Sequence, residues 1–127
     1  MSNKFLIQNF FFVLIIFALI FTSIEANAQK KPKITFIELG SVKCIPCKKM
    51  QPIMKSLEKK YGDQLKVVFY DVWKKEHKDK SEKYGIKLIP TQVFLDENGK
   101  EIHRHEGYYP ESEIDKFLQG KGLTAKS

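Results

Sequence analysis

Beyond residue 32, the spacing of the hydrophobic residues changes several times and divides the chain into strands and helices. Residues 33–40 (KITFIELG) are rich in β-branched and aromatic side chains and end on a glycine, which is typical of a buried strand. From residue 45 to about residue 61, apolar residues recur at helical spacing, and Gly62 is placed to end the helix. The apolar face of this helix consists of Ile45, Met50, Ile53, Met54, Leu57 and Tyr61.

After residue 64, predicted strands and helices continue to alternate along the chain. Residues 65–73 (LKVVFYDVW) predict a second strand, and the charged residues 74–83 predict a polar surface helix that ends before Gly85. Residues 91–107 predict two strands around the pair Asn98-Gly99, because Asn-Gly is a strong signal for a tight hairpin turn.

A short helix from about Pro110 to Leu118 completes the pattern. The predicted order is therefore β-α-β-α-β-β-α. This order favours an α/β sandwich in which the first two strands pair in parallel and the last two form an antiparallel hairpin.

The first 28 residues follow a different pattern. One lysine, Lys4, precedes an apolar stretch that only Gln8 and Asn9 interrupt, and Ala-Asn-Ala at 26–28 is a small-x-small cleavage site. We therefore expect a signal peptide over residues 1–28, cleavage near Ala28, and a domain over residues 29–127 that works in the periplasm or is secreted. The alternative is an uncleaved membrane anchor, but the uninterrupted apolar run 10–21 is shorter than the roughly 20 residues that a spanning helix needs.

Composition and charge limit the function classes. A chain of 127 residues has room for about one domain, and 43% hydrophobic residues are enough for a core. The net charge of +7 comes from lysines spread along most of the chain, without a nucleic-acid motif, so we expect no nucleic-acid partner. We also expect a monomer.

The only two cysteines, Cys44 and Cys47, lie between the first predicted strand and the helix that follows. As a structural disulfide, so short a loop would contribute only about 2 kcal/mol. As a metal site, the pair supplies two of the four ligands that zinc needs, and His77, His103 or His105 would have to complete it. His103 and His105 alternate on one strand, where we expect them to be surface residues.

A redox dithiol fits this position better. The free N–H groups at a helix N-terminus stabilise a thiolate, and Lys43 adds a neighbouring positive charge. An exposed thiolate at Cys44 can attack a disulfide, while Cys47 is within reach to resolve the mixed disulfide. A copper- or zinc-binding protein that uses Cys44, Cys47 and a histidine remains the alternative.

Several stretches together resemble the thioredoxin family over about residues 33–120. CIPCKKMQP, at 44–52, is similar to the family's active-site loop and helix. YGIKLIPTQVF, at 84–94, is similar to the stretch that contains the family's cis-proline, which would make Ile89-Pro90 the cis bond. Glu38 matches the family's buried carboxylate, and Gly107 matches the glycine after the last strand.

The chain also departs from the family pattern. Lys43 replaces the tryptophan that precedes the first cysteine, and Phe69 stands where a lysine often lies near the buried carboxylate. The extra strand and helix that open a full thioredoxin are missing, so we expect a thioredoxin-like fold shortened at its N-terminus.

The resemblance implies an extracytoplasmic thiol-disulfide oxidoreductase, and the Ile-Pro pairs of CIPC and Ile89-Pro90 look like the reducing branch of the family. In that role, Cys44 is the nucleophile, Cys47 the resolving thiol and Glu38 the proton acceptor. The implied partners are disulfide-bearing client proteins and a membrane thiol-electron donor, and no cofactor is implied. The expected substrate-binding residues are Ile89, Pro90, Ile45, Pro46 and Gly107.

Overall fold

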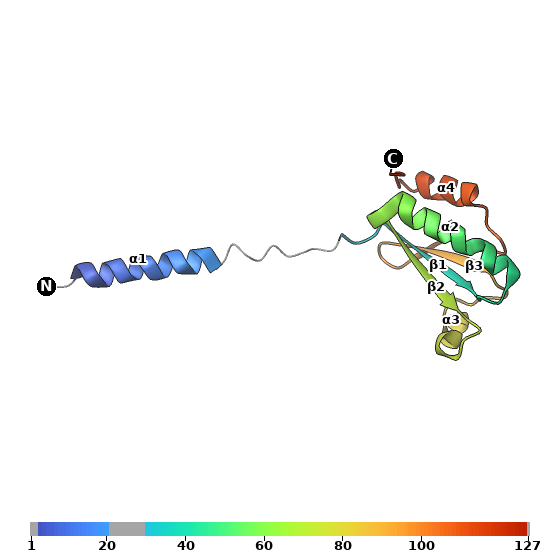
Figure 1. Cartoon of the computed structure of the whole chain (residues 1–127), viewed down its shortest axis with the longest axis horizontal. Helices are drawn as coiled ribbons and strands as arrows, with labels where there is room; N and C mark the ends of the chain where they lie inside the picture. The colour runs from blue at the N-terminus through green and yellow to red at the C-terminus, as the bar shows by residue number, and fades with distance from the viewer. Residues whose placement is uncertain (1–2, 21–29, 127) are drawn as a thin grey trace.

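A computed structural model of the chain describes residues 3–20 and 30–126 (Figure 1). A helix, α1 (Asn3–Ile20), precedes the domain, and the predicted cleavage site at Ala28 lies outside the described residues. No helix within the two described ranges is long and apolar enough to cross a membrane. The domain then follows the order β1 (Ile34–Gly40), α2 (Ile45–Tyr61), β2 (Leu65–Asp71), α3 (Lys78–Lys83), β3 (Thr91–Asp96), β4 (Glu101–Glu106) and α4 (Glu111–Gly120).

This order confirms the predicted β-α-β-α-β-β-α pattern. The four strands form one sheet in the order β2-β1-β3-β4, with β1 parallel to β2 and antiparallel to β3. Strands β3 and β4 form the predicted antiparallel hairpin. The strand β1 is therefore central, and β2 leaves one sheet edge open within the described residues.

Two hydrophobic clusters lie on opposite faces of the sheet. Because side chains alternate along a strand, Phe36 and Glu38 of β1 share one face, whereas Ile37 and Leu39 share the other. Phe36 joins the larger cluster, which includes buried residues of α2 and α4, and Leu39 joins the smaller cluster near α3. Figure 1 shows α2 and α4 together on one side of the sheet and α3 on the other.

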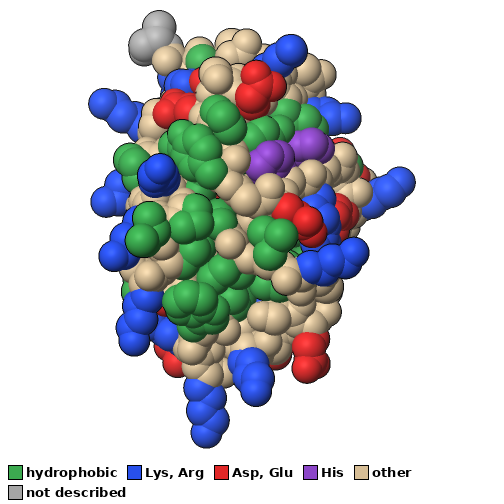
Figure 2. All heavy atoms as spheres, turned by 90° about the vertical axis from the view of Figure 1, so that its right-hand side faces the viewer, with side chains coloured by type: hydrophobic (Ala, Val, Ile, Leu, Met, Phe, Trp, Pro, Cys, Tyr) green, Lys and Arg blue, Asp and Glu red, His purple; other side chains and the backbone are tan. Residues whose placement is uncertain are grey.

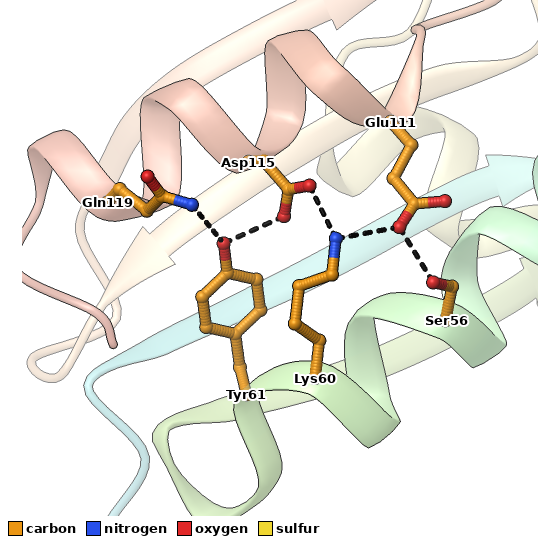
Figure 3. Close-up of polar contacts among 6 residues, drawn as sticks. All are labelled: Ser56, Lys60, Tyr61, Glu111, Asp115 and Gln119. Carbon is orange, nitrogen blue, oxygen red and sulfur yellow. Dashed lines mark hydrogen bonds and ion pairs between the residues drawn. The ribbon is translucent and has the colours of Figure 1, made fainter. Parts of the chain in front are cut away.

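A chain of polar contacts joins α4 to α2 (Figure 3). The ammonium group of Lys60 lies between the carboxylates of Glu111 and Asp115. The hydroxyl of the buried Tyr61 donates to Asp115 Oδ1 at 2.7 Å, and the hydroxyl of Ser56 donates to Glu111 Oε1 at 2.6 Å. These contacts hold α4 in one position along α2, and the sequence pattern alone did not predict them.

The side chain of Gln64, in the short 3-10 turn Gly62–Gln64, connects the beginning and the end of the domain. Its Nε2 group donates to the Thr124 carbonyl at 2.8 Å, and its Oε1 accepts from the Thr124 N–H at 2.9 Å. The backbone carbonyl of Gln64 accepts from the Lys33 N–H at 3.0 Å, directly before β1. The segments on either side of the domain therefore meet beside Gln64.

Candidate redox site

Cys44 and Cys47 form a disulfide at the N-terminus of α2. Cys44 is the N-cap residue of the helix, and its Sγ accepts a hydrogen bond from the Cys47 N–H at 3.4 Å. Pro46 lies in the first turn, where a missing N–H costs no helical hydrogen bond. Cys44 is 8% exposed and Cys47 is 0% exposed, so Cys44 is the sulfur that an incoming protein reaches first.

Gly40, the last residue of β1, lies against the second cysteine. A Cβ atom at Gly40 would lie 3.2 Å from both Cβ and Sγ of Cys47 and 3.5 Å from the ring of Phe69. The absence of a side chain at this position therefore lets Cys47 pack directly against the end of the central strand.

The loop before β3 reaches the same end of the sheet. The Ile89-Pro90 peptide bond is cis, and Pro90 is buried. Thr91 pairs with Leu39 of β1, so Pro90 lies beside the end of the strand that leads to Cys44. Gly107, which has a positive φ of 88°, donates its N–H to the Pro90 carbonyl at 2.7 Å.

Glu38 is fully buried in the middle of β1. Its Oε1 accepts a hydrogen bond from Gln92 Nε2 at 3.3 Å, while no hydrogen-bond partner contacts its Oε2 within the described residues. Burial raises the pKa of Glu38 to about 8, although the hydrogen bond from Gln92 acts in the opposite direction. The carboxyl can therefore take up or release a proton near neutral pH. In the register of β1 and β2, Glu38 pairs with Phe69. Phe69 therefore lies beside the buried carboxyl, where members of the family often have a lysine.

The sequence pattern missed two polar residues of the site. Asp71 organises the loop before Cys44, because its carboxylate accepts from the N–H groups of Val42 and Trp73 at 3.2 Å each. Burial alone would raise the pKa of Asp71, but these backbone hydrogen bonds and one from the Ser41 hydroxyl outweigh it and lower the pKa. The only signal for Asp71 in the sequence is its place as an acidic residue at the end of an apolar strand. Gln92 is the second residue that the sequence pattern missed.

His103 and His105 are not the surface residues that we expected. Both are half-buried, since the face of β4 that carries them packs against Tyr109. His105 stacks on the Tyr109 ring at 3.9 Å between centroids, and His103 Nε2 lies 3.0 Å from the Tyr109 hydroxyl. Burial, followed by the charges of His105 and Lys121, lowers the pKa of His103. In residues 3–20 and 30–126, no group of three or more His, Cys, Asp or Glu side chains could hold a metal ion.

Exposed apolar side chains lie in the segments that follow β1, β2 and β4 and precede β3, at the end of the sheet where the disulfide lies. We call the residues Val42, Ile45, Trp73, Leu88 and Tyr108 the docking patch. Ile45 is 72% exposed and Trp73 is 62% exposed, an arrangement that costs free energy unless another molecule covers it. Figure 2 looks onto the end of the molecule where β1 ends and α2 begins, and it shows hydrophobic side chains gathered across this face with basic side chains around them.

Known proteins share this fold. The family model of the thioredoxin-like domain matches residues 22–121. A chloroplastic thioredoxin Y from rice is 31% identical over 106 residues, which cover 84% of this chain but only 61% of the rice protein. The thioredoxin of Bacillus subtilis is 27% identical over 92 residues, which cover 72% of this chain and 86% of that protein.

Solved structures agree with these sequence matches. The germline-specific thioredoxin Deadhead of Drosophila melanogaster superposes with a TM-score of 0.62 at 28% identity, covering 73% of this chain and 84% of Deadhead. Plasmodium falciparum thioredoxin superposes with a TM-score of 0.62 at 26% identity, covering 76% of each chain. The match over residues 22–121 shows that the chain belongs to the thioredoxin-like domain family, and its Cys44–Cys47 disulfide lies within the matched residues.

Proposed function

We propose that this protein reduces disulfide bonds of other proteins outside the cytoplasm. The observation that carries this proposal is that Cys44 and the docking patch lie at the same end of the sheet. Apolar side chains that remain exposed around a reactive sulfur suit a protein client, because an unfolded or flexible segment can cover them while its disulfide reaches Cys44.

The reaction moves two electrons from this protein to the client. The Cys44 thiolate attacks one sulfur of the client disulfide, forms a mixed disulfide and releases the first client thiolate. Cys47 then loses its proton and attacks Sγ of Cys44. This second attack forms the Cys44–Cys47 disulfide and releases the second client thiolate.

Glu38 takes the proton of Cys47 in the second step of this proposal. Gly40 and Glu38 lie on the same face of β1, and Cys47 packs directly on Gly40. A base with a pKa near the working pH accepts a proton at little cost in driving force, and the pKa of about 8 for Glu38 meets that condition.

The client binds along the edge formed by Ile89 and Pro90. Pro90 has no N–H, and the loop that contains it lies beside the end of β1, so the backbone of Ile89 can pair with an extended client segment. Ile45, Pro46 and Gly107 complete the contact surface around the disulfide.

The oxidised protein needs another protein to reduce it again. The sequence contains two cysteines, and both take part in the active-site disulfide, so no internal dithiol can supply electrons. A membrane protein that passes electrons through its own thiols is the donor that an extracytoplasmic location calls for.

The N-terminal segment supports export. Helix α1 exposes large apolar side chains, among them Leu6, Phe10 and Phe12, which suits recognition as a signal peptide. A fusion of residues 1–28 to a reporter protein should carry the reporter out of the cytoplasm. Mass spectrometry of the exported full chain should find Gln29 as the first residue, whereas an intact N-terminus in a membrane fraction would indicate an anchor.

The direction of electron flow is tested by the reduction potential of the Cys44–Cys47 pair. We expect equilibration with glutathione to give a potential below about −200 mV, in the range of reducing members of the fold. Dithiothreitol-driven reduction of insulin should be fast with the wild type and no faster than with dithiothreitol alone when Cys44→Ser is used. A potential near about −120 mV would instead identify an oxidant of client proteins.

A further inference from the structure

Three residues on neighbouring strands form a hydrogen-bonded row across the face of the sheet below α2. Glu38 pairs with Gln92 in the β1–β3 register, and Gln92 pairs with His105 in the β3–β4 register. Gln92 Nε2 donates to Glu38 Oε1 at 3.3 Å, and Gln92 Oε1 lies 2.9 Å from His105 Nδ1. The row therefore runs from the buried carboxyl to a half-buried histidine.

We propose that Gln92 and His105 are positioning residues for the step in which Cys47 resolves the mixed disulfide. His105 holds the amide of Gln92, and this amide holds the carboxyl of Glu38 so that Oε2 is free to take the proton of Cys47. The inference rests on the proposed function, because it concerns the same proton transfer.

The Gly107 carbonyl fixes the orientation of the Gln92 amide. Gln92 Nε2 lies 3.1 Å from this carbonyl oxygen, which can only accept a hydrogen bond. The NH2 group of Gln92 must therefore point toward Gly107 and Glu38, and its oxygen must point toward His105. It follows that His105 carries a hydrogen on Nδ1.

This orientation gives the two oxygens of Glu38 different roles. Oε1 already accepts from the Gln92 NH2 group, so a proton on Glu38 is better placed on Oε2, which has no partner in the part of the chain that the structure describes. The same hydrogen bond favours the ionised carboxylate and limits the rise of the Glu38 pKa that burial causes. Gln92 thus keeps more of the base ready at neutral pH.

The other groups near this row do not replace Gln92. From β2, the neighbour of Glu38 is Phe69, which has no charge, and from α2 the disulfide-bonded Cys47 lies against Gly40 at the end of β1. On the far side of Gln92, His103 and Tyr109 contact each other, and the His105 ring stacks on Tyr109. No lysine, arginine, aspartate or glutamate forms a hydrogen bond or ion pair with Glu38 within the described residues.

The test follows the titration of Glu38 by carboxyl-carbon NMR in the oxidised full chain, in which the cysteines do not titrate. Glu38→Gln assigns the signal. Gln92→Met keeps the side-chain length but removes both N–H donors, and it should move the midpoint upward by about one pH unit, the equivalent of one hydrogen bond. His105→Phe keeps the stacked ring and should shift the midpoint in the same direction by less, because the amide remains.

His103→Phe is the matched control. It changes the neighbouring histidine on the same face of β4 and leaves the bond to Gln92 in place, so the Glu38 midpoint should not move. In single-turnover measurements, Gln92→Met should slow the resolution step at pH 7 by up to about tenfold and less at higher pH. In the Glu38→Gln background, Gln92→Met should change this rate no further.

The outcomes separate this inference from the proposed function. An unchanged Glu38 midpoint in both Gln92→Met and His105→Phe overturns the positioning role, even if the protein reduces insulin. If Gln92→Met does not fold, His105→Phe alone decides. If the Glu38 midpoint shifts in the two variants but the wild-type protein reduces no disulfide, the positioning geometry is supported and the proposed function is overturned.

Discussion

Replacing Glu38 by glutamine should change how the stability of the oxidised protein depends on pH. In the folded protein the pKa of Glu38 is about 8, compared with an ordinary value of 4.5, and burial is the largest cause. Between these two values, the folded protein holds a proton that the unfolded chain releases. The contribution of Glu38 to the free energy of unfolding therefore falls as the pH rises from about 4.5 through about 8.

The size of the effect follows from the difference between the two pKa values. One pKa unit corresponds to 1.36 kcal/mol, so the wild type should lose about 3 kcal/mol more than Glu38→Gln between pH 5 and pH 8. Glu38 is fully buried, so solvent screening reduces this figure little. The absolute stability of the variant is less informative, because a buried glutamine amide beside Gln92 costs about 1–3 kcal/mol where it lacks partners.

Urea denaturation of both proteins at pH 5, 6, 7 and 8 measures this difference. The disulfide keeps Cys44 and Cys47 from titrating, and the two proteins differ only at residue 38, so the contributions of groups that do not contact this residue cancel in the comparison. Two curves that stay parallel from pH 5 to pH 8 would refute the reasoning, since Glu38 would then have the same pKa in the folded and unfolded states.

Three further predictions test other parts of the site and the fold. One equivalent of an alkylating agent at neutral pH should label Cys44 of the reduced protein before Cys47, and peptide mapping that finds the reverse order would exchange their roles. Asp115→Ala should lower the free energy of unfolding by about 1–2 kcal/mol in urea denaturation, because the buried Tyr61 hydroxyl loses its acceptor; no change would mean that water replaces the carboxylate. Gly40→Ala should destabilise the oxidised protein by about 1 kcal/mol, because its Cβ would crowd the Sγ of Cys47, and an unchanged melting temperature would show that the helix moves aside freely.

The sequence predicted the order of the elements because each one had a strong local signal. The predicted helix 45–61 has the bounds of α2, and its predicted apolar face is buried except for Ile45, which is exposed. The Asn98-Gly99 pair lies in the turn between β3 and β4. The second strand ends at Asp71 instead of residue 73, because the Asp71 carboxylate accepts from the N–H of Trp73 and turns the chain.

The polar contacts of the site depended on tertiary structure that local patterns do not contain. Gln92 becomes visible as a partner of Glu38 only when the register of β1 and β3 is known, because 54 residues separate the two in sequence. His103 and His105 alternate as surface residues of an edge strand would. They are half-buried because the segment after Gly107 folds back and places Tyr109 against them.

The hydrogen bonds of Gln64 have a practical consequence for how the protein can be attached to other molecules. They bring Lys33 and Thr124 together at the beginning of β1, seven strand residues away from the end that leads to Cys44. A tether at either side of the domain, whether a carrier protein, a solid support or a lipid-facing segment, therefore leaves the disulfide pointing away from the attachment point. A short linker that joins these two positions would also allow circular permutation, with new chain ends at the exposed Asn98-Gly99 turn. The surface that meets the client would not change.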